Sequence, residues 1–245
     1  MDKLIEVCAG SYQDCLAADR GGARRVELNS ALCVGGLTPS LATLRRVKRD
    51  TKLQAICMVR PRAAGFCYSP EERAVMLEDA EIFLENGADG IAFGFLKENR
   101  EVDMVHTERM TALIHRYGKD AVFHRAFDVT PDPDKAMERL IASQVDRVLT
   151  SGQKKTALEG IALIRTLQVR YGKEIQILPG SGVNGANALK ILEETGVSQL
   201  HSSCKGYLTD ATTAFGEVSY AYLPGTHSYD YDVVDQALVE KLVNV

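Results

Sequence analysis

Residues 53–95 read LQAICMVRPRAAGFCYSPEERAVMLEDAEIFLENGADGIAFGF and contain one complete strand–helix–strand unit. The apolar run 53–60 predicts a strand, and Ser69 followed by Pro70 is a helix start signal. The helix then has apolar residues at helical spacing, namely Met76, Leu77, Ala80, Phe83 and Leu84, and ends at Asn86-Gly87. A second strand, 90–95, follows. This order is typical of two parallel strands joined by a helix.

The same alternation occurs about eight times along the chain. The predicted strands are 4–8, 25–29, 53–60, 90–95, 121–127, 147–150, 174–178 and 199–202. Eight units predict a single (β/α)8 barrel of the TIM type over residues 1–245. An open doubly wound sheet is the alternative, but the first turn, Ala9-Gly10-Ser11, lacks its glycine signature and eight units favour closure.

The segment 204–232 departs from this pattern, because it is rich in Gly, Thr, Ser and Tyr and precedes a final helix. Long segments without predicted structure are usually lids, interfaces or mobile. Its aromatic residues include Tyr220, Tyr222, Tyr229 and Tyr231. We therefore expect a lid or an interface.

Charge and composition exclude some classes of partner. The formal net charge is -4 at pH 7, without a run of Lys and Arg, so nucleic acid binding is not expected. No stretch of about 18 apolar residues predicts a membrane span, and no signal-peptide pattern is present. The six cysteines form no C-x-x-C pair, which favours reduced thiols. We expect a cytoplasmic protein.

Side-chain alternation along the first two strands predicts polar groups inside the barrel. It turns Glu6 and Cys8 inward in the first strand, and Glu27 and Asn29 in the second. Buried carboxylates require cations or hydrogen-bond donors. We expect these to come from the C-terminal ends of other strands, where barrel active sites lie.

Charged residues follow the third and fifth strands: Arg60 and Arg62 after the third, and His124, Arg125 and Asp128 after the fifth. Alternation implies that His124 and Arg125 do not both point inward while the strand is regular. His124 and His201 are suited to carry protons near neutral pH. The candidate catalytic residues are Glu6, Glu27, His124, Asp128 and His201. The alternative is a buried ion-pair network that only supports the barrel.

Loops after the last strands predict an anion site. The loop after the seventh strand contains Gly180-Ser181-Gly182, and barrels that bind phosphate use main-chain N–H groups at this place. The glycines are equally explained by a tight turn. The candidate ligand-binding residues are Arg60, Arg62, Arg125, Ser151, Gly180, Ser181, Gly182 and Ser203. For a metal, the inward Cys8 is the candidate, since soft sulfur ligands select Cu(I).

Seven motifs occur in a fixed order: Glu6-Val7-Cys8, Arg25-Val26-Glu27-Leu28, Gly35-Gly36-Leu37-Thr38-Pro39-Ser40, Val59-Arg60-Pro61-Arg62, Phe123-His124-Arg125-Ala126-Phe127-Asp128, Arg147-Val148-Leu149-Thr150-Ser151-Gly152 and Pro179-Gly180-Ser181-Gly182. On these motifs the chain resembles the CutC family, described as copper homeostasis proteins, over about residues 4–203. The resemblance implies a TIM-type barrel, a cytoplasmic location and a homodimer or larger assembly.

The resemblance also implies copper. The copper proposal for the family uses thiols, one at the position of Cys8 and, in members that read E-L-C, another where this chain has Asn29. Asn is a poor substitute for a Cu(I) thiolate. Three functions therefore stay open: a Cu(I)-binding protein, a barrel enzyme that acts on a small anionic metabolite such as a phosphorylated one, and a non-catalytic scaffold.

Overall fold

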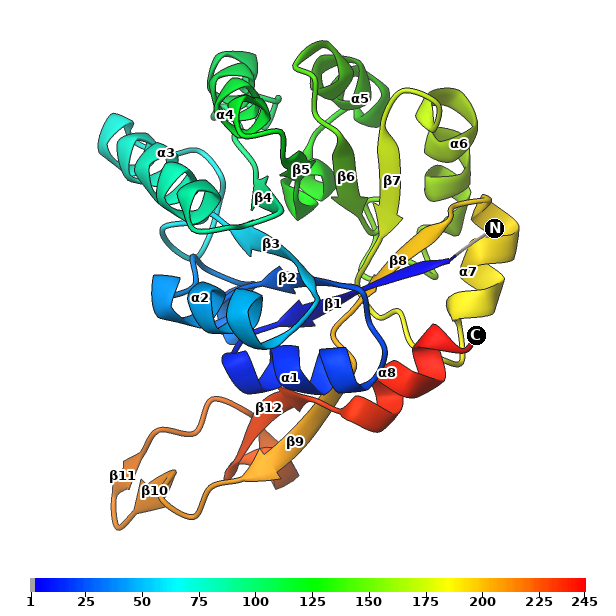
Figure 1. Ribbon diagram of the computed structural model, residues 1–245. Coiled ribbons are helices and arrows are strands. Elements are labelled where there is room, and N and C mark those ends of the chain that lie inside the picture. Colours follow the sequence, from blue (N-terminus) through cyan, green and yellow to red (C-terminus); the bar gives the residue numbers. More distant parts are fainter. Residues whose placement is uncertain (1–2) are drawn as a thin grey trace.

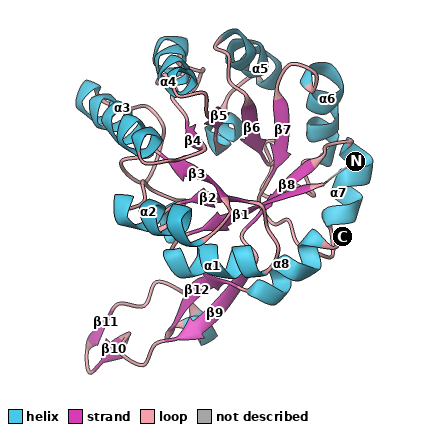
Figure 2. Ribbon diagram, viewed as in Figure 1, coloured by secondary structure: helices cyan, strands magenta, loops and turns pink. Residues whose placement is uncertain are grey.

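The computed structural model describes residues 3–245, in which eight parallel strands form a barrel inside a layer of helices (Figure 1; Figure 2). This confirms the predicted (β/α)8 barrel. The strands are β1 Leu4–Ala9, β2 Arg25–Leu28, β3 Gln54–Met58, β4 Gly90–Phe93, β5 Asp120–Phe123, β6 Arg147–Thr150, β7 Gln176–Pro179 and β8 Gln199–Ser202. The helices are α1 Tyr12–Arg20, α2 Leu41–Asp50, α3 Pro70–Glu85, α4 Met104–Arg116, α5 Pro133–Ala142, α6 Ile161–Tyr171, α7 Ala188–Thr195 and α8 Gln236–Val243.

The strands follow the hydrogen-bonded order β7-β6-β5-β4-β3-β2-β1-β8. The two end strands, β7 and β8, lie side by side, and the amide of Gln199 donates to Gln176 Oε1 between them at 3.1 Å. The sheet is therefore a nearly closed barrel. Because all eight strands are parallel, their C-terminal ends meet at one mouth.

Two apolar clusters hold the barrel. The larger one lies between the sheet and the helices and includes Val7, Val26 and Cys57. The smaller one, inside the barrel, is Ile56, Met58, Ala92 and Val122 from β3, β4 and β5. The interior is thus apolar along these three strands.

The start of α3 shows why the local sequence folds as predicted. Ser69 Oγ accepts a hydrogen bond from the N–H of Glu72 at 3.2 Å, and the Glu72 carboxylate accepts one from the N–H of Ser69 at 2.8 Å. This reciprocal capping box satisfies two backbone donors that the first turn leaves free. Pro70 then occupies the first turn, where its missing N–H costs nothing.

The fifth strand is shorter than predicted. β5 ends at Phe123, and the short helix η2, Arg125–Val129, begins directly after it. His124 stands between them, and its Nδ1 accepts the N–H of Ala126 at 3.1 Å. Because the strand is no longer regular here, His124 and Arg125 both line the mouth, and the conflict expected from alternation does not arise.

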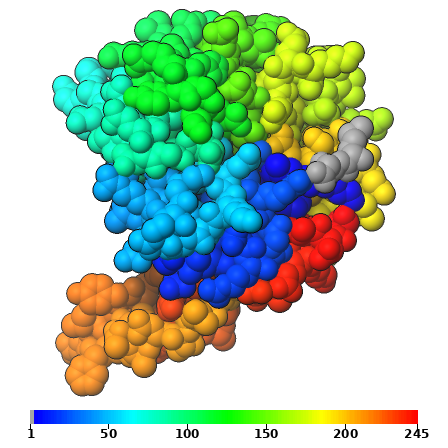
Figure 3. Space-filling view, viewed as in Figure 1, coloured from blue at the N-terminus to red at the C-terminus, as the bar shows by residue number. Residues whose placement is uncertain are grey.

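The segment 204–232 contains regular structure that the sequence did not predict. β9 Lys205–Thr209 pairs with β12 Asp230–Val234 in an antiparallel ribbon, and β10 Ala214–Phe215 pairs with β11 Val218–Ser219; η3 Gly225–His227 precedes β12. The ribbon projects from the barrel (Figure 3, orange). Phe215 and Tyr220 are 92% and 82% exposed. A lid or interface role stays a prediction.

Within residues 3–245, no helix has the length and apolar character that a membrane span requires. All six cysteines of the chain are free thiols, and Cys33 and Cys67 are exposed.

Candidate functional site

The register of three adjacent strands brings the predicted inward residues together. Glu6 of β1 is paired with Arg25 of β2 and with His201 of β8, and Cys8 of β1 is paired with Glu27 of β2. Parallel strands in register direct paired side chains to the same face. The polar half of the interior is therefore built by β8, β1 and β2.

Glu6 lies below Cys8 in this half and binds two partners. Arg25 Nε donates to its Oε2 at 2.5 Å, and His201 Nδ1 contacts its Oε1 at 2.8 Å. Burial opposes ionisation of Glu6, but Arg25 and His201 outweigh it and lower its pKa to about 2. Glu6 is thus a carboxylate at neutral pH, and it fixes the orientation of the His201 ring.

Cys8, Glu27 and His201 form the group nearest the mouth. One ligand atom from each of the three lies within 4.8 Å of the others. Because Nδ1 of His201 is held by Glu6, Nε2 is the nitrogen that stays available to a metal. Cys8 Sγ lies 3.8 Å from Glu27 Oε2. The buried Glu27 Oε1 has no hydrogen-bond partner among the described residues. We call these three residues the mouth triad.

Asn29, which directly follows β2, contacts two members of the triad. Its Nδ2 donates to Glu27 Oε2 at 3.0 Å and to Cys8 Sγ at 3.6 Å. The Glu27 carboxylate and the Cys8 thiolate are both negatively charged when they bind a metal. Gly36 leaves the space for this amide, since a Cβ there would lie 2.3 Å from Asn29 Oδ1.

The electrostatics of the triad favour its protonated forms. Burial raises the pKa of the Cys8 thiol above its usual 9.0. Burial also raises the pKa of Glu27, and Glu6 adds to that rise. Burial opposes protonation of His201, but its hydrogen bonds to Cys8 and Glu6 raise its pKa well above 6.5. Without a metal, His201 is therefore a cation and Cys8 a neutral thiol at pH 7.

The triad opens into a cavity of about 310 Å³ at the mouth. The other lining residues are Leu32, Gly35, Met58, Arg60, Phe66, His124, Arg125, Leu149, Ser181, Gly182, Ser203 and Lys205. Six of the eight predicted ligand-binding positions lie at or beside it: Arg60, Arg125, Ser181, Gly182 and Ser203 in the lining, and Gly180 next to Ser181. A Cβ at Gly180 would lie 2.7 Å from Cδ1 of Leu149, so this glycine leaves room for the Leu149 side chain.

Two predicted residues lie away from the cavity. Arg62 binds the Glu72 carboxylate at 2.5 Å and lies 5.1 Å over the ring of Tyr68, at the start of α3. Ser151 is fully buried, and its hydroxyl donates to the carbonyl of Lys154 at 2.6 Å. Cys204 is close to His201 in the sequence and is buried, but it is not part of the mouth triad.

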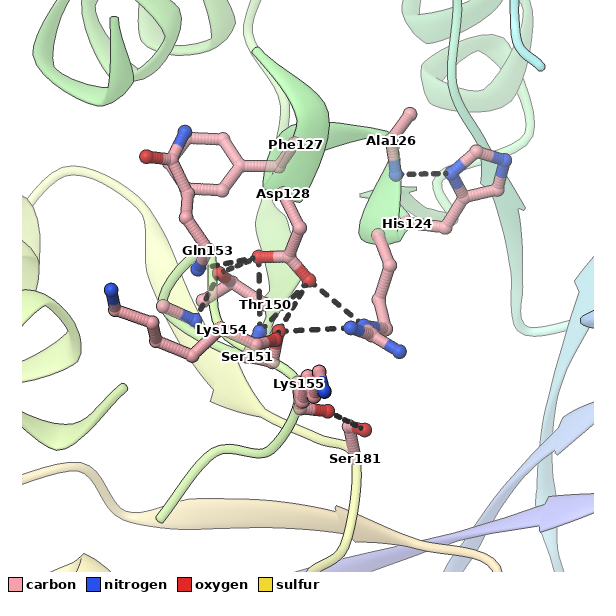
Figure 4. Close-up of polar contacts among 12 residues, drawn as sticks. His124, Ala126, Phe127, Asp128, Thr150, Ser151, Gln153, Lys154, Lys155 and Ser181 are labelled. Carbon is pink, nitrogen blue, oxygen red and sulfur yellow. Dashed lines mark hydrogen bonds and ion pairs between the residues drawn. The ribbon is translucent and has the colours of Figure 1, made fainter. Parts of the chain in front are cut away.

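Asp128, a predicted catalytic residue, anchors the loop after β6 (Figure 4). Its carboxylate accepts hydrogen bonds from Thr150 Oγ1 at 2.5 Å and from the N–H groups of Ser151 and Gln153 at 3.0 and 3.2 Å. Arg125 Nε also donates to it, at 2.8 Å. With its oxygens occupied in this way, Asp128 positions Arg125 and the loop.

We predict that Asp128→Asn lowers the free energy of unfolding by about 2–3 kcal/mol, because the new NH₂ group faces backbone donors that lose their acceptor. Urea denaturation followed by circular dichroism measures it. Asp134→Asn is the control, since Asp134 pairs with Arg170 on the surface and its loss costs about 0–1 kcal/mol. Equal stability of the two variants would show that Asp128 has no anchoring role.

Sequence reasoning missed two features of the site. It assigned the cations for Glu6 to residues after the third and fifth strands, whereas Arg25 of the adjacent strand binds it. It also did not combine Cys8, Glu27 and His201 into one ligand set. Side-chain alternation could have placed Arg25 inside the barrel, since Arg25 lies two residues before the inward Glu27.

Comparisons with known proteins agree with this architecture. The model of the CutC family matches residues 3–206, which include all eight barrel strands. A family protein CutC of Treponema denticola is 52% identical over 80% of this chain and 79% of its own length. The mouse copper homeostasis protein cutC homolog is 40% identical over 82% of this chain and 74% of its own length.

Solved structures give the same result. The crystal structure of the CutC protein from Streptococcus agalactiae has a TM-score of 0.77 and 32% identity, and the match covers 82% of this chain and 98% of that one. Phosphoribosylanthranilate isomerase from Thermotoga maritima, with a TM-score of 0.56 and 11% identity, shares the barrel fold alone. On the family match and these identities, the chain belongs to the CutC family.

Proposed function

We propose that the barrel mouth binds a copper ion as cargo in copper homeostasis, with the Cys8 thiolate, His201 Nε2 and the Glu27 carboxylate as ligands. The observation that carries this proposal is the approach of the three ligand atoms to within 4.8 Å of one another. The unpartnered Glu27 Oε1 supports it, since buried oxygens rarely lack a partner. The names of the mouse and streptococcal relatives refer to copper homeostasis, which is why we propose copper as the metal.

The donor set suits a soft or borderline ion. A thiolate and an imidazole are good ligands for Cu(I), whereas a carboxylate is a harder donor. The Glu6 carboxylate behind His201 is the outer partner that metal-binding histidines usually have. Asn29 replaces a second thiol and donates hydrogen bonds to Cys8 and Glu27. One protein thiolate instead of two is expected to make the site weaker and more easily exchanged.

Anaerobic titration of the protein with Cu(I) against a chromophoric chelator tests the proposal. We expect one Cu(I) per chain, and we expect Zn(II) in equal amount not to displace it. Failure to compete with the chelator, or displacement by Zn(II), would contradict the assignment to copper.

Copper affinity is predicted to rise with pH. The Cys8 thiol and the His201 imidazolium both have raised pKa values, so both carry a proton at neutral pH that a metal displaces. Binding should therefore release two protons per ion, and affinity should fall by up to about 100-fold per pH unit as the pH is lowered. Titrations between about pH 6 and about pH 8 measure the slope. A flat profile would exclude these two residues as ligands.

The second candidate is an enzyme that acts on a small anionic metabolite, such as a phosphorylated one. The size of the cavity favours it, because about 310 Å³ exceeds the volume that one ion needs. Glu6, Glu27, His124 and His201 would then be the acid–base residues. A thermal-shift screen of phosphorylated and carboxylated metabolites tests it, with stabilisation expected to be lost in Arg60→Ala. If neither copper nor a metabolite binds, the scaffold alternative is supported.

We further propose that the protein acts in the cytoplasm as a homodimer or larger assembly. The family resemblance and the exposed aromatic side chains of the β9–β12 ribbon support this. Sedimentation velocity tests it, and a monomer at all concentrations would contradict it.

A further inference from the structure

The mouth cavity is larger than a metal site. One water molecule takes about 30 Å³ of liquid, whereas pockets for organic ligands begin at about 300 Å³. The cavity measures about 310 Å³. With an ion on the triad, most of this volume is still available to a small molecule.

The two halves of the cavity differ in chemistry. The mouth triad comes from β8, β1 and β2, and the opposite half comes from β3, β5, β6 and the loops that follow β3 and β5. That opposite half offers the apolar side chains Met58, Phe66 and Leu149. A ligand that fills the cavity therefore needs an apolar body.

The charges of the lining favour an anion. It contains the basic side chains Arg60, Arg125 and Lys205 and the imidazolium of His201, against one carboxylate, Glu27. Arg125 and Lys205 each pair with an aspartate, Asp128 and Asp232, but no described carboxylate forms an ion pair with Arg60. A positive lining of this kind attracts anions.

Arg60 gives the strongest evidence for an anionic ligand, because it is charged and only 5% exposed. Its guanidinium donates to the carbonyl groups of Val34, Gly36 and Ala64, at 3.0, 2.8 and 2.7 Å, and its Nε has no partner among the described residues. Carbonyl groups solvate the charge without neutralising it. A buried cation without a counter-ion is costly unless a ligand supplies the negative charge.

His124 adds a neutral donor on the same side. Its Nδ1 accepts a backbone N–H, so the proton of the ring is on Nε2. Burial, and then the nearby Arg60, lower its pKa to about 3. The side chain is 3% exposed, and Nε2 has no partner among the described residues. The Phe66 ring packs 5.0 Å from the His124 ring and 5.3 Å from the Arg60 guanidinium, which ties the two donors to the apolar wall.

We propose that the mouth cavity binds a small organic anion with an apolar body, whose acid group lies against Arg60 and Arg125, across the barrel from the triad. The proposal deepens the second candidate function by naming the class of ligand and its orientation, and it does not depend on copper. Carboxylates and phosphate monoesters share the required oxyanion chemistry.

Isothermal titration calorimetry of the metal-free protein, in the presence of a chelator, tests the proposal. The probes are benzoate and phenyl phosphate, which distinguish the two acid groups, with benzamide as the neutral control. We expect saturable 1:1 binding of at least one anion and none of benzamide. Because no metal is present, failure of copper binding leaves this result unaffected.

Variants locate the acid group. Arg125→Gln should weaken the bound anion about tenfold or more, as expected for loss of a hydrogen bond to a charged group. Arg125→Lys keeps the charge and should give an intermediate affinity, which guards against a folding defect in the first variant. Arg170→Gln is the matched control, since Arg170 also pairs with an aspartate but lies on the outer surface. No saturable anion binding, equal binding of benzamide, or equal affinity in Arg125→Gln and Arg170→Gln would overturn the proposal.

Discussion

Replacing Cys8 by serine is expected to weaken Cu(I) binding by at least about 100-fold. Loss of an outer partner of a metal site already costs about 10–100-fold, and Cys8 is the only thiolate donor of the mouth triad. A serine hydroxyl is a hard donor and does not replace the sulfur. Anaerobic competition with a Cu(I) chelator measures the change.

The control for this variant is Cys67→Ser. Cys67 is an exposed thiol on the loop after β3 and is not in the cavity lining. Its replacement should leave the affinity unchanged, which separates the site from adventitious binding by surface thiols. If both variants lose copper equally, or if neither does, the triad is not the copper site.

Replacing Glu6 by glutamine is expected to lower the free energy of unfolding by about 3–5 kcal/mol. The variant leaves the Arg25 guanidinium buried without its carboxylate, and breaking a buried pair on one side has this cost. It also removes the negative partner of His201. Chemical denaturation at pH 7 measures the loss. Glu194→Gln is the matched control, because Glu194 pairs with Lys190 on the exposed surface of α7, where about 0–1 kcal/mol is expected.

The difference between the wild-type protein and Glu6→Gln should shrink in acid. Glu6 has a folded-state pKa of about 2 against an ordinary value of 4.5, so its contribution is complete above about pH 4.5 and is lost as the pH falls toward 2. Denaturation at a series of pH values tests this. A difference that stays constant between pH 5 and pH 3 would contradict the ionised Glu6.

The fold and part of the site could be predicted because they depend on local patterns. The strand–helix alternation is repeated eight times, so an error of a few residues in one strand does not change the architecture. Side-chain alternation correctly placed four polar residues inside the barrel. Cys8, Glu27 and Asn29 contact one another, and Glu6 contacts His201.

The remaining features depend on contacts that local patterns do not contain. The pairing of Glu6 with Arg25 and His201 follows from the register between strands, which β-type runs alone do not fix. Arg60 binds carbonyl groups of two loops, and their path is not visible in the sequence. The early end of β5 depends on the helix η2 that starts after His124.

Extended X-ray absorption fine structure of the Cu(I)-loaded protein tests the copper site most directly. We predict one sulfur ligand per copper together with nitrogen or oxygen ligands, and loss of the sulfur signal in Cys8→Ser. A first coordination shell with two or more sulfur atoms, or with none, would contradict binding at Cys8, Glu27 and His201.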